Sequence, residues 1–234
     1  MKIDFHPGLW KSRKQMSESM LVWILLTFSG GYMDAYTYLF RGGVFANAQT
    51  GNLILLGLNL VDGNFLKSIK YIIPVFSFLL GVFIAQLVRM RMQTKRWFHW
   101  RQLTILIEAL LMLGVSFLTG FHPIANSMVS FACGLQVQSF RVYNGKPIAT
   151  TMCVGNLRTG ADYLCAYIHS KKKRHLRTSL LYFGIIGIFM LGAVGGKIGV
   201  HLFGQKATLI NVLLLGSAFI LMMAEPTDAN SPSA

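Results

Sequence analysis

Two short motifs of the same type place residues that could bind a polar ligand within otherwise apolar sequence. Gly51 and Asn52 form the first motif, and Gly155 and Asn156 form the second. Each follows a polar segment with glycine or proline and precedes an apolar run, which predicts that a helix begins there. The first N–H groups of a helix have no backbone partner and carry partial positive charge, so both motifs suit an anion or a carboxylate.

Neighbouring residues extend this candidate site. Thr50 is predicted to cap the first helix, while Arg141 and Arg158 bring positive charge near the second motif. We therefore expect a small polar or anionic solute to bind between the motifs. The predicted solute-binding residues are Thr50, Gly51, Asn52, Arg141, Gly155, Asn156 and Arg158. An alternative is that the glycines only allow helices to pack closely, as small residues do in membranes.

Two acidic residues are candidates for binding a coupling ion. Asp34 and Glu108 both lie in apolar segments, where an ionised carboxylate is costly unless it faces a cavity or a partner. Asp34 could bind a proton or Na⁺ that drives transport, or it could form a structural bridge with Arg141 or Arg158. Glu108 is the second candidate proton carrier, or else it forms a hydrogen bond between helices.

The motifs of common enzymes and metal sites do not occur in the sequence. There is no His-Glu-x-x-His, no Gly-x-Ser-x-Gly and no paired aspartate motif, so we expect no enzyme, no metal site and no cofactor. Cys133, Cys153 and Cys165 lie in apolar segments without the spacing of metal ligands, which predicts a packing role.

The composition is typical of a membrane protein. Of 234 residues, 53% are hydrophobic and 13% are charged, whereas soluble domains carry about 25% charged residues. Several apolar runs reach the roughly 20 residues that cross a bilayer. The net charge of +14 lies mostly between these runs, as the positive-inside rule requires. We therefore expect the lipid bilayer, and no nucleic acid, as the partner.

The apolar runs and their interruptions predict one membrane domain at 20–223. A basic cytoplasmic lead precedes it at 1–19, and a disordered tail with few apolar residues follows at 224–234. The predicted apolar segments are 20–40, 51–61, 71–88, 103–118, 124–142, 147–167, 180–203 and 207–223.

An internal repeat relates the two halves of this domain. The stretch 30–52 aligns without a gap with 134–156, at an offset of 104 residues. We expect repeat A at about 20–119 and repeat B at about 124–223.

Basic residues predict how the repeats cross the membrane. If the segments near 42–62 and 147–167 enter and leave by one face, the loop cations outside are only Arg41, Lys67, Lys70 and Lys206. If both segments crossed the membrane fully, the basic residues would divide almost equally between its two faces. The sequence thus predicts an all-α polytopic membrane protein with six full spans and two broken, re-entrant segments. Three crossings in each half invert the second repeat, a recurring plan of transporters.

The two repeated stretches resemble the YoaK family of bacterial integral membrane proteins. The matching residues are Gly31, Tyr32, Asp34, Ala35, Phe45, Thr50, Gly51, Asn52, Gly134, Leu135, Gln136, Thr150, Thr151, Gly155, Asn156 and Leu157. Val154 departs from the family, which repeats a threonine there. The resemblance extends over about 20–223 and implies a multi-pass protein of the bacterial plasma membrane. The family is a domain of unknown function, so the resemblance implies no substrate.

We expect a small secondary transporter whose central site lies where the two broken segments meet. Alternating access would rock one repeat against the other, and glycine-rich runs could pack two chains into a homodimer. Two other classes remain open. A scaffold or sensor without transport would have a centre filled by apolar side chains, and an intramembrane enzyme would have a titratable pair at a cavity, such as Asp34 beside Glu108.

Overall fold

The computed structural model describes residues 19–92 and 100–224. The predicted lead, except for Ser19, and the predicted tail from residue 225 lie outside these ranges. The helices are α1 (Met20–Phe40), α2 (Gln49–Val61), α3 (Phe65–Met92), α4 (Trp100–Phe117), α5 (His122–Ser139), α6 (Cys153–Ser170), α7 (Lys173–Phe203) and α8 (Thr208–Met223). A 3₁₀ turn, η2 (Gly204–Ala207), joins α7 to α8, and two-residue strands β1 (Val142–Tyr143) and β2 (Lys146–Pro147) form a hairpin. The predicted all-α architecture is confirmed for these ranges.

Three stretches of the described chain are long and apolar enough to cross a membrane. They are Phe65–Met92, Trp100–Phe117 and Lys173–Met223, the last of which includes α7, η2 and α8. The helices α1 and α5 are not among them. Both are largely buried and carry polar residues on buried faces, including Ser29 and Asp34 on α1 and Gln136 on α5. They are therefore the inner helices of a helical membrane protein.

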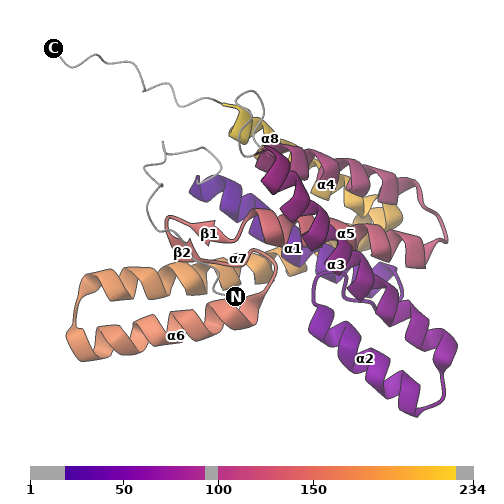
Figure 1. The fold of residues 1–234 in the computed structure, drawn as a ribbon, viewed down its shortest axis with the longest axis horizontal. Coiled ribbons are helices and arrows are strands. Elements are labelled where there is room, and N and C mark those ends of the chain that lie inside the picture. The colour runs from indigo at the N-terminus through magenta and orange to yellow at the C-terminus, as the bar shows by residue number, and fades with distance from the viewer. Residues whose placement is uncertain (1–18, 93–99, 225–234) are drawn as a thin grey trace.

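The helices can be grouped into two bundles, with α6 and α7 at one side of the molecule and α2 and α3 at the other (Figure 1). The α1 bundle contains α1, α6, α7 and α8, in which α1 packs against α7 and α8, and α6 packs against α7. The α5 bundle contains α2, α3, α4 and α5, in which α5 packs against α3 and α4, and α2 packs against α3. Contact between the bundles runs mainly along α4 and α8. Each bundle thus combines helices from both halves of the sequence.

Two interruptions carry the chain from one bundle to the other. The first break, residues 41–48, leads from α1 to α2, and the second break, residues 140–152, leads from α5 to α6. Gly42 and Gly43 have φ angles of 87° and 74° in the first break. Residues with a side chain rarely adopt this conformation, so the two glycines allow the chain to turn away from α1.

Four Phe-x-x-Gly sequences join the long helices within the bundles. They lie at 28–31 on α1, 78–81 on α3, 131–134 on α5 and 189–192 on α7. The sequences at 28–31 and 189–192 face each other, as do those at 78–81 and 131–134. In every case a Cβ on the glycine would collide with the carbonyl group of the partner phenylalanine. Glycine is therefore required for these helices to lie so close.

This pairing corrects the predicted alignment of the repeats. Gly31, and not Gly30, occupies the position of Gly134, so the offset in the inner helices is 103 residues. At Asn52 and Asn156 the offset is 104. The gap-free alignment was therefore wrong by one residue, which is accommodated in the longer second break.

The glycine-rich run of α7 is used inside the chain. Gly192 and Gly195 contact Phe28, while Gly196 and Gly199 contact Tyr32 of α1. The hydroxyl of Tyr32 also donates to the carbonyl of Ala207 at 2.8 Å. This face of α7 is consequently not available to join two chains, which removes the packing argument for a homodimer.

The helices α4 and α8 run antiparallel along the contact between the bundles. Gln102 Nε2, at the start of α4, donates to the carbonyl of Met222 at the end of α8, at 2.7 Å. Gln205 Nε2, just before α8, donates to the carbonyl of Ser116 at the end of α4, at 2.9 Å. Each helix thus supplies a donor for the unpaired carbonyl groups at the end of the other.

Several helix boundaries differ from those predicted. The helices α3 and α7 begin at Phe65 and Lys173, six and seven residues earlier than expected, and α5 ends at Ser139 instead of near residue 142. The apolar pattern misses the polar or exposed first turns of α3 and α7. The early end of α5 leaves Arg141 in the second break.

Candidate functional site

The first break is attached to α1 by Asp34. Its Oδ1 atom accepts the backbone N–H of Asn47 at 2.9 Å, and the backbone of Ala48 also donates to its carboxyl group. The side chain of Asn47 then donates to the carbonyl of Gly30 at 2.8 Å. Asp34 is 7% exposed, so its buried carboxyl is committed to orienting the backbone of the break.

The predicted bridge from Asp34 to a basic residue does not form in the described part of the chain. Arg141 and Arg158 are both exposed, whereas the partners of Asp34 are backbone amides of the first break. The bridge interpretation was therefore wrong, and the structural role of Asp34 is to hold the break.

The second break reaches the same part of α1. A Cβ on Gly30 would lie 3.1 Å from the carbonyl oxygen of Thr150. The hydroxyl of Thr150 accepts from Gln136 Nε2 of α5 at 2.8 Å, and the sulfur of Cys133 lies 3.7 Å from the hydroxyl oxygen of Thr151. Both breaks therefore meet at Gly30, in the middle of α1.

The asparagines of the two Gly-Asn motifs form the same contact in each half. Asn52 Oδ1 accepts the N–H of Phe45 at 3.2 Å, and Asn52 Nδ2 donates to the carbonyl of Phe45 at 2.6 Å. Asn156 forms the equivalent pair with Ala149, at 3.2 and 2.7 Å. We call this contact the asparagine clamp. It ties an extended segment to the first turn of the next helix, so these amides are already occupied.

Thr50 and Gly51 do not have the roles expected of them. The helix α2 begins at Gln49, with Ala48 at the N-cap position and no side-chain cap bond. Thr50 is exposed within the first turn, so its predicted capping role was wrong. A Cβ on Gly51 would lie 3.0 Å from the ring of Phe45, so this glycine packs against the first break.

Three predicted residues gather around a second-half pocket. Arg141, Gly155 and Asn156 line a depression of about 280 Å³ between the end of α5, the second break and the start of α6. Thr50, Gly51, Asn52 and Arg158 do not line it. The structure therefore separates the predicted solute-binding residues into one group near α2 and another near α6.

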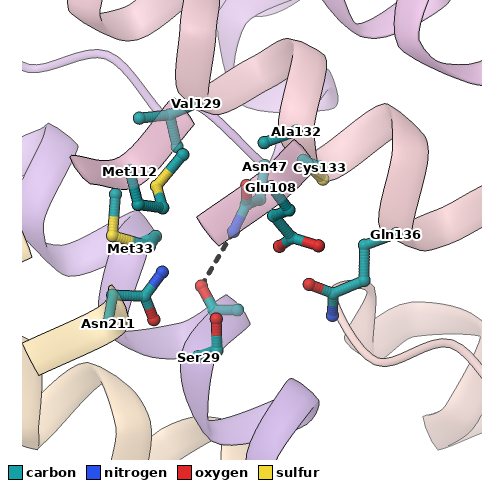
Figure 2. Close-up of a pocket in the computed structure, with 11 residues that line it drawn as sticks. Ser29, Met33, Asn47, Glu108, Met112, Val129, Ala132, Cys133, Gln136 and Asn211 are labelled. Atoms are coloured by element: carbon teal, nitrogen blue, oxygen red, sulfur yellow. Dashed lines mark hydrogen bonds between the residues drawn. The ribbon is translucent and has the colours of Figure 1, made fainter. Parts of the chain in front are cut away.

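A small cavity lies where the two bundles meet (Figure 2). Its volume of about 10 Å³ is close to the minimum that holds one water molecule. It is lined by Ser29, Gly30, Met33, Asn47, Glu108, Met112, Val129, Ala132, Cys133, Gln136 and Asn211. Both inner helices, the first break, α4 and α8 contribute, so this cavity is the centre of the molecule.

Glu108 and Asn211 bring unpaired polar atoms to the cavity. Glu108 on α4 is 4% exposed and Asn211 on α8 is 1% exposed. Within the described residues, Glu108 Oε2 and Asn211 Oδ1 have no hydrogen-bond partner. Glu108 lies on α4 and Asn211 on α8, the last helices of the two halves, so each half brings one unpaired polar atom to the cavity.

Sequence reasoning missed Asn211 and Arg41. Asn211 is a polar residue inside the apolar run of α8, a signal that could have identified it. Arg41 was counted among the loop cations outside, but it is fully buried. It donates to the carbonyl groups of Val115 and Leu118, at 2.9 and 2.7 Å. These carbonyls end α4, where a cation is favourable, so Arg41 caps that helix.

The remaining titratable side chains do not gather into a metal site. In the parts of the chain that are described, no three His, Cys, Asp or Glu side chains lie close enough to hold a metal ion. The central cavity contains the carboxyl of Glu108 and the thiol of Cys133, and its other polar lining is neutral. The arrangement can therefore bind a water molecule or a proton, and no basic side chain of the described residues lines it.

Comparisons with known proteins agree with the membrane architecture. The family described as "Protein of unknown function (DUF1275)" matches residues 22–221. The chain is similar to the UPF0700 transmembrane protein YoaK of Bacillus subtilis (strain 168), with 25% identity over 177 residues. The similar region covers 73% of this chain and 79% of that relative. No solved structure matches the chain.

Proposed function

The chain belongs to the DUF1275 family of YoaK-like transmembrane proteins, and from this premise we propose that it is a small carrier. It would move a small polar or anionic solute across the bacterial plasma membrane, with its N-terminus in the cytoplasm. One observation carries the proposal: both breaks meet at Gly30, beside a small, partly polar cavity between two bundles. Interrupted backbone at membrane depth is tolerated where it is buried in protein or lines a cavity.

An inverted repeat is part of this proposal. Equivalent helices of an inverted repeat run in opposite directions across the membrane. The helices α4 and α8 end their respective halves, and reciprocal bonds from Gln102 and Gln205 set them antiparallel. The recurrence of the Phe-x-x-Gly contacts and of the asparagine clamp also supports two equivalent halves. Six full spans and two segments that do not cross fit this arrangement.

The moving units would be the two bundles and not the two sequence repeats. Tight glycine contacts join α1 to α7 and α3 to α5, and each contact links helices of different repeats. Rocking one repeat against the other would break all of them. Rocking the α1 bundle against the α5 bundle keeps them intact and moves the contact along α4 and α8. The two breaks would then act as hinges, which absorb changes in backbone angles.

The conformation described here would be a closed state of the carrier. The cavity of about 10 Å³ has no room for a solute larger than water. The pocket of about 280 Å³ with Arg141 and the first turn of α6 is the place where a polar or anionic solute would first bind. Opening of the bundles would then connect that pocket with the centre.

Two features of the centre argue against the other classes. A scaffold or sensor without transport was expected to have an apolar centre, but Asn47, Glu108 and Gln136 line the cavity. An intramembrane enzyme was expected to have a titratable pair at a cavity, such as Asp34 beside Glu108, but Asp34 is not among the lining residues and the thiol of Cys133 is the other titratable group there. These features favour the carrier proposal.

Cysteine labelling tests the carrier without knowledge of its solute. Met112 on α4 lines the cavity and is 1% exposed. The natural cysteines 133, 153 and 165 would be replaced by alanine and Met112→Cys introduced. The purified protein would be placed in vesicles, and a membrane-impermeant maleimide would be applied to one side at a time. Alternating access predicts labelling from both sides.

Leu113→Cys is the matched control. Leu113 follows Met112 on the same helix but is 37% exposed on the outer surface, where lipid would surround it. We expect no labelling of this variant from either side. Labelling of Met112→Cys from neither side would favour a scaffold, and labelling from one side only would indicate a binding pocket without transport.

A further inference from the structure

Only one of the two candidate carboxyl groups is available at the centre. Asp34 is occupied by the backbone amides of the first break. Glu108 is equally buried, but its Oε2 atom has no hydrogen-bond partner among the described residues and its side chain lines the central cavity. We propose that Glu108 is the proton-binding group of the carrier and that one water molecule in the cavity links it to Asn211. This inference deepens the proposed function and rests on it.

The charges around Glu108 favour a proton over a permanent ion pair. The helix α8 carries no charged residue. His122 of α5, Lys206 of η2 and Lys67 of α3 are exposed. The other basic residues of α3 are Lys70, Arg89 and Arg91, and none of them lines the cavity. Cys133 is the other titratable side chain that lines it. A buried carboxylate without a cation is costly, so a bound proton removes the cost of closing the cavity.

The cavity also accounts for the unpaired atoms. Among the described residues, Glu108 Oε2 and Asn211 Oδ1 both lack a hydrogen-bond partner, and each side chain lines a space of about 10 Å³. That space is sufficient for about one water molecule, which needs two or more polar partners. A protonated Oε2 would donate to the water, and the water would donate to Asn211 Oδ1. Both orphaned atoms would then be hydrogen-bonded.

The position of the pair couples proton binding to movement. Glu108 belongs to the α5 bundle and Asn211 belongs to the α1 bundle, so the bridging water lies across the moving contact. When the bundles open to one side, the Glu108 carboxyl releases its proton to water on that side and becomes a carboxylate. Closing again would remove water from this charge, so the carboxylate must first bind a proton. The proton thus controls closure of the cavity.

Infrared spectroscopy measures this protonation directly. The full-length protein in lipid would be titrated with pH, and the carbonyl stretch of protonated carboxyl groups recorded against a reference pH. We expect Glu108→Gln to lose one titrating band that the wild type shows. The control Asp34→Asn alters the other buried carboxyl and keeps that band. Persistence of all bands in Glu108→Gln would overturn the proposal.

Asn211→Leu keeps the carboxyl group but removes the acceptor for the water. We expect the same band to move to higher frequency, because the carboxyl loses its hydrogen-bonded neighbour. This variant remains informative if Glu108→Gln does not fold. An unmoved band in Asn211→Leu would contradict the water bridge.

A sodium arm distinguishes the proton from a metal cation. The wild-type titration would be repeated with Na⁺ replaced by the large cation N-methylglucamine at equal ionic strength. A proton site predicts the same titration midpoint in both salts. A midpoint that shifts with Na⁺ would overturn the proposal in favour of a sodium site. None of these spectra requires transport, so failure here and failure of the labelling test can be told apart.

Discussion

The first break and the second break differ in how they are attached to the inner helices. The first break is held by the carboxyl of Asp34, which accepts backbone amides, in addition to neutral bonds from Asn126 and Ser130 of α5 to its carbonyl groups. The hydrogen bonds that hold the second break come from neutral groups: Gln136 of the inner helix α5 donates to Thr150, and the hydroxyl of Tyr182 on α7 donates to the carbonyl of Pro147, at 2.9 Å. Both breaks share the asparagine clamp.

This comparison distinguishes the asparagine clamp, which occurs in both halves, from side-chain contacts that occur in one half only. The clamp pairs the same two backbone groups at the same spacing in both halves, although Phe45 and Ala149 differ in side chain. The clamp depends on backbone geometry alone, so it is independent of the residue it holds. The bonds between each break and the inner helices use different side chains. In the first half the carboxyl group of Asp34 accepts them, and in the second half the neutral amide of Gln136 donates them.

Removal of the clamp should have the largest effect, and it should be equal in both halves. Asn52→Ala and Asn156→Ala each leave a part-buried N–H and a part-buried carbonyl unpaired. One fully buried unsatisfied group costs roughly 1–3 kcal/mol. Because these two groups are part-buried, we expect a loss of about 2–4 kcal/mol in the free energy of unfolding. Thermal unfolding in detergent measures it.

Asn59→Ala is the control for this pair. Asn59 lies on α2, is partly exposed, and donates to the carbonyl of Leu55 within the same helix. That carbonyl is already part of the helix, so we expect little change in the unfolding temperature. If Asn52→Ala and Asn156→Ala differ strongly from each other, the two clamps are not equivalent and the repeat argument weakens.

The attachment to the inner helices should distinguish the breaks. Asp34→Ala removes the acceptor of two backbone amides of the first break, and each buried group left unsatisfied costs roughly 1–3 kcal/mol. Gln136→Leu removes neutral bonds to Thr150 and Leu26, each contributing roughly 0.5–1.5 kcal/mol. We expect Asp34→Ala to destabilise the protein more.

Asp34→Asn sharpens the same comparison. Asparagine keeps an oxygen that can accept the N–H of Asn47 but loses the charge, so its unfolding temperature should lie between those of the wild type and Asp34→Ala. An unfolding temperature of Asp34→Asn as low as that of Asp34→Ala would show that the charge, and not the accepting oxygen, holds the first break.

Much of the architecture could be predicted from the sequence because each feature depends on local pattern. Apolar runs of sufficient length indicated the helices, and α1 and α8 lie close to their predicted ranges. Glycines and polar residues between those runs located both breaks.

The partners of individual side chains could not be predicted in this way. The pattern around Asn52 and Asn156 indicates a helix start, but it does not show that the amide is bonded to the backbone seven residues earlier. Arg41 resembles a loop cation until the end of α4 is placed beside it. The exchange of helices between bundles depends on contacts over long sequence distances, which no local pattern records.

The smallest expected effect concerns Thr50 and its counterpart in the second half, Val154. An N-cap threonine contributes about 1 kcal/mol to helix stability, but Thr50 forms no cap bond and is exposed, and Val154 is 81% exposed. Exposed positions without such contacts change stability by less than about 0.5 kcal/mol. Thr50→Ala and Val154→Thr should therefore both unfold at the wild-type temperature. If Thr50→Ala alone lost about 1 kcal/mol in the free energy of unfolding, Thr50 would form a cap bond in a conformation other than the closed one. The first break would then have an attachment that the second break lacks.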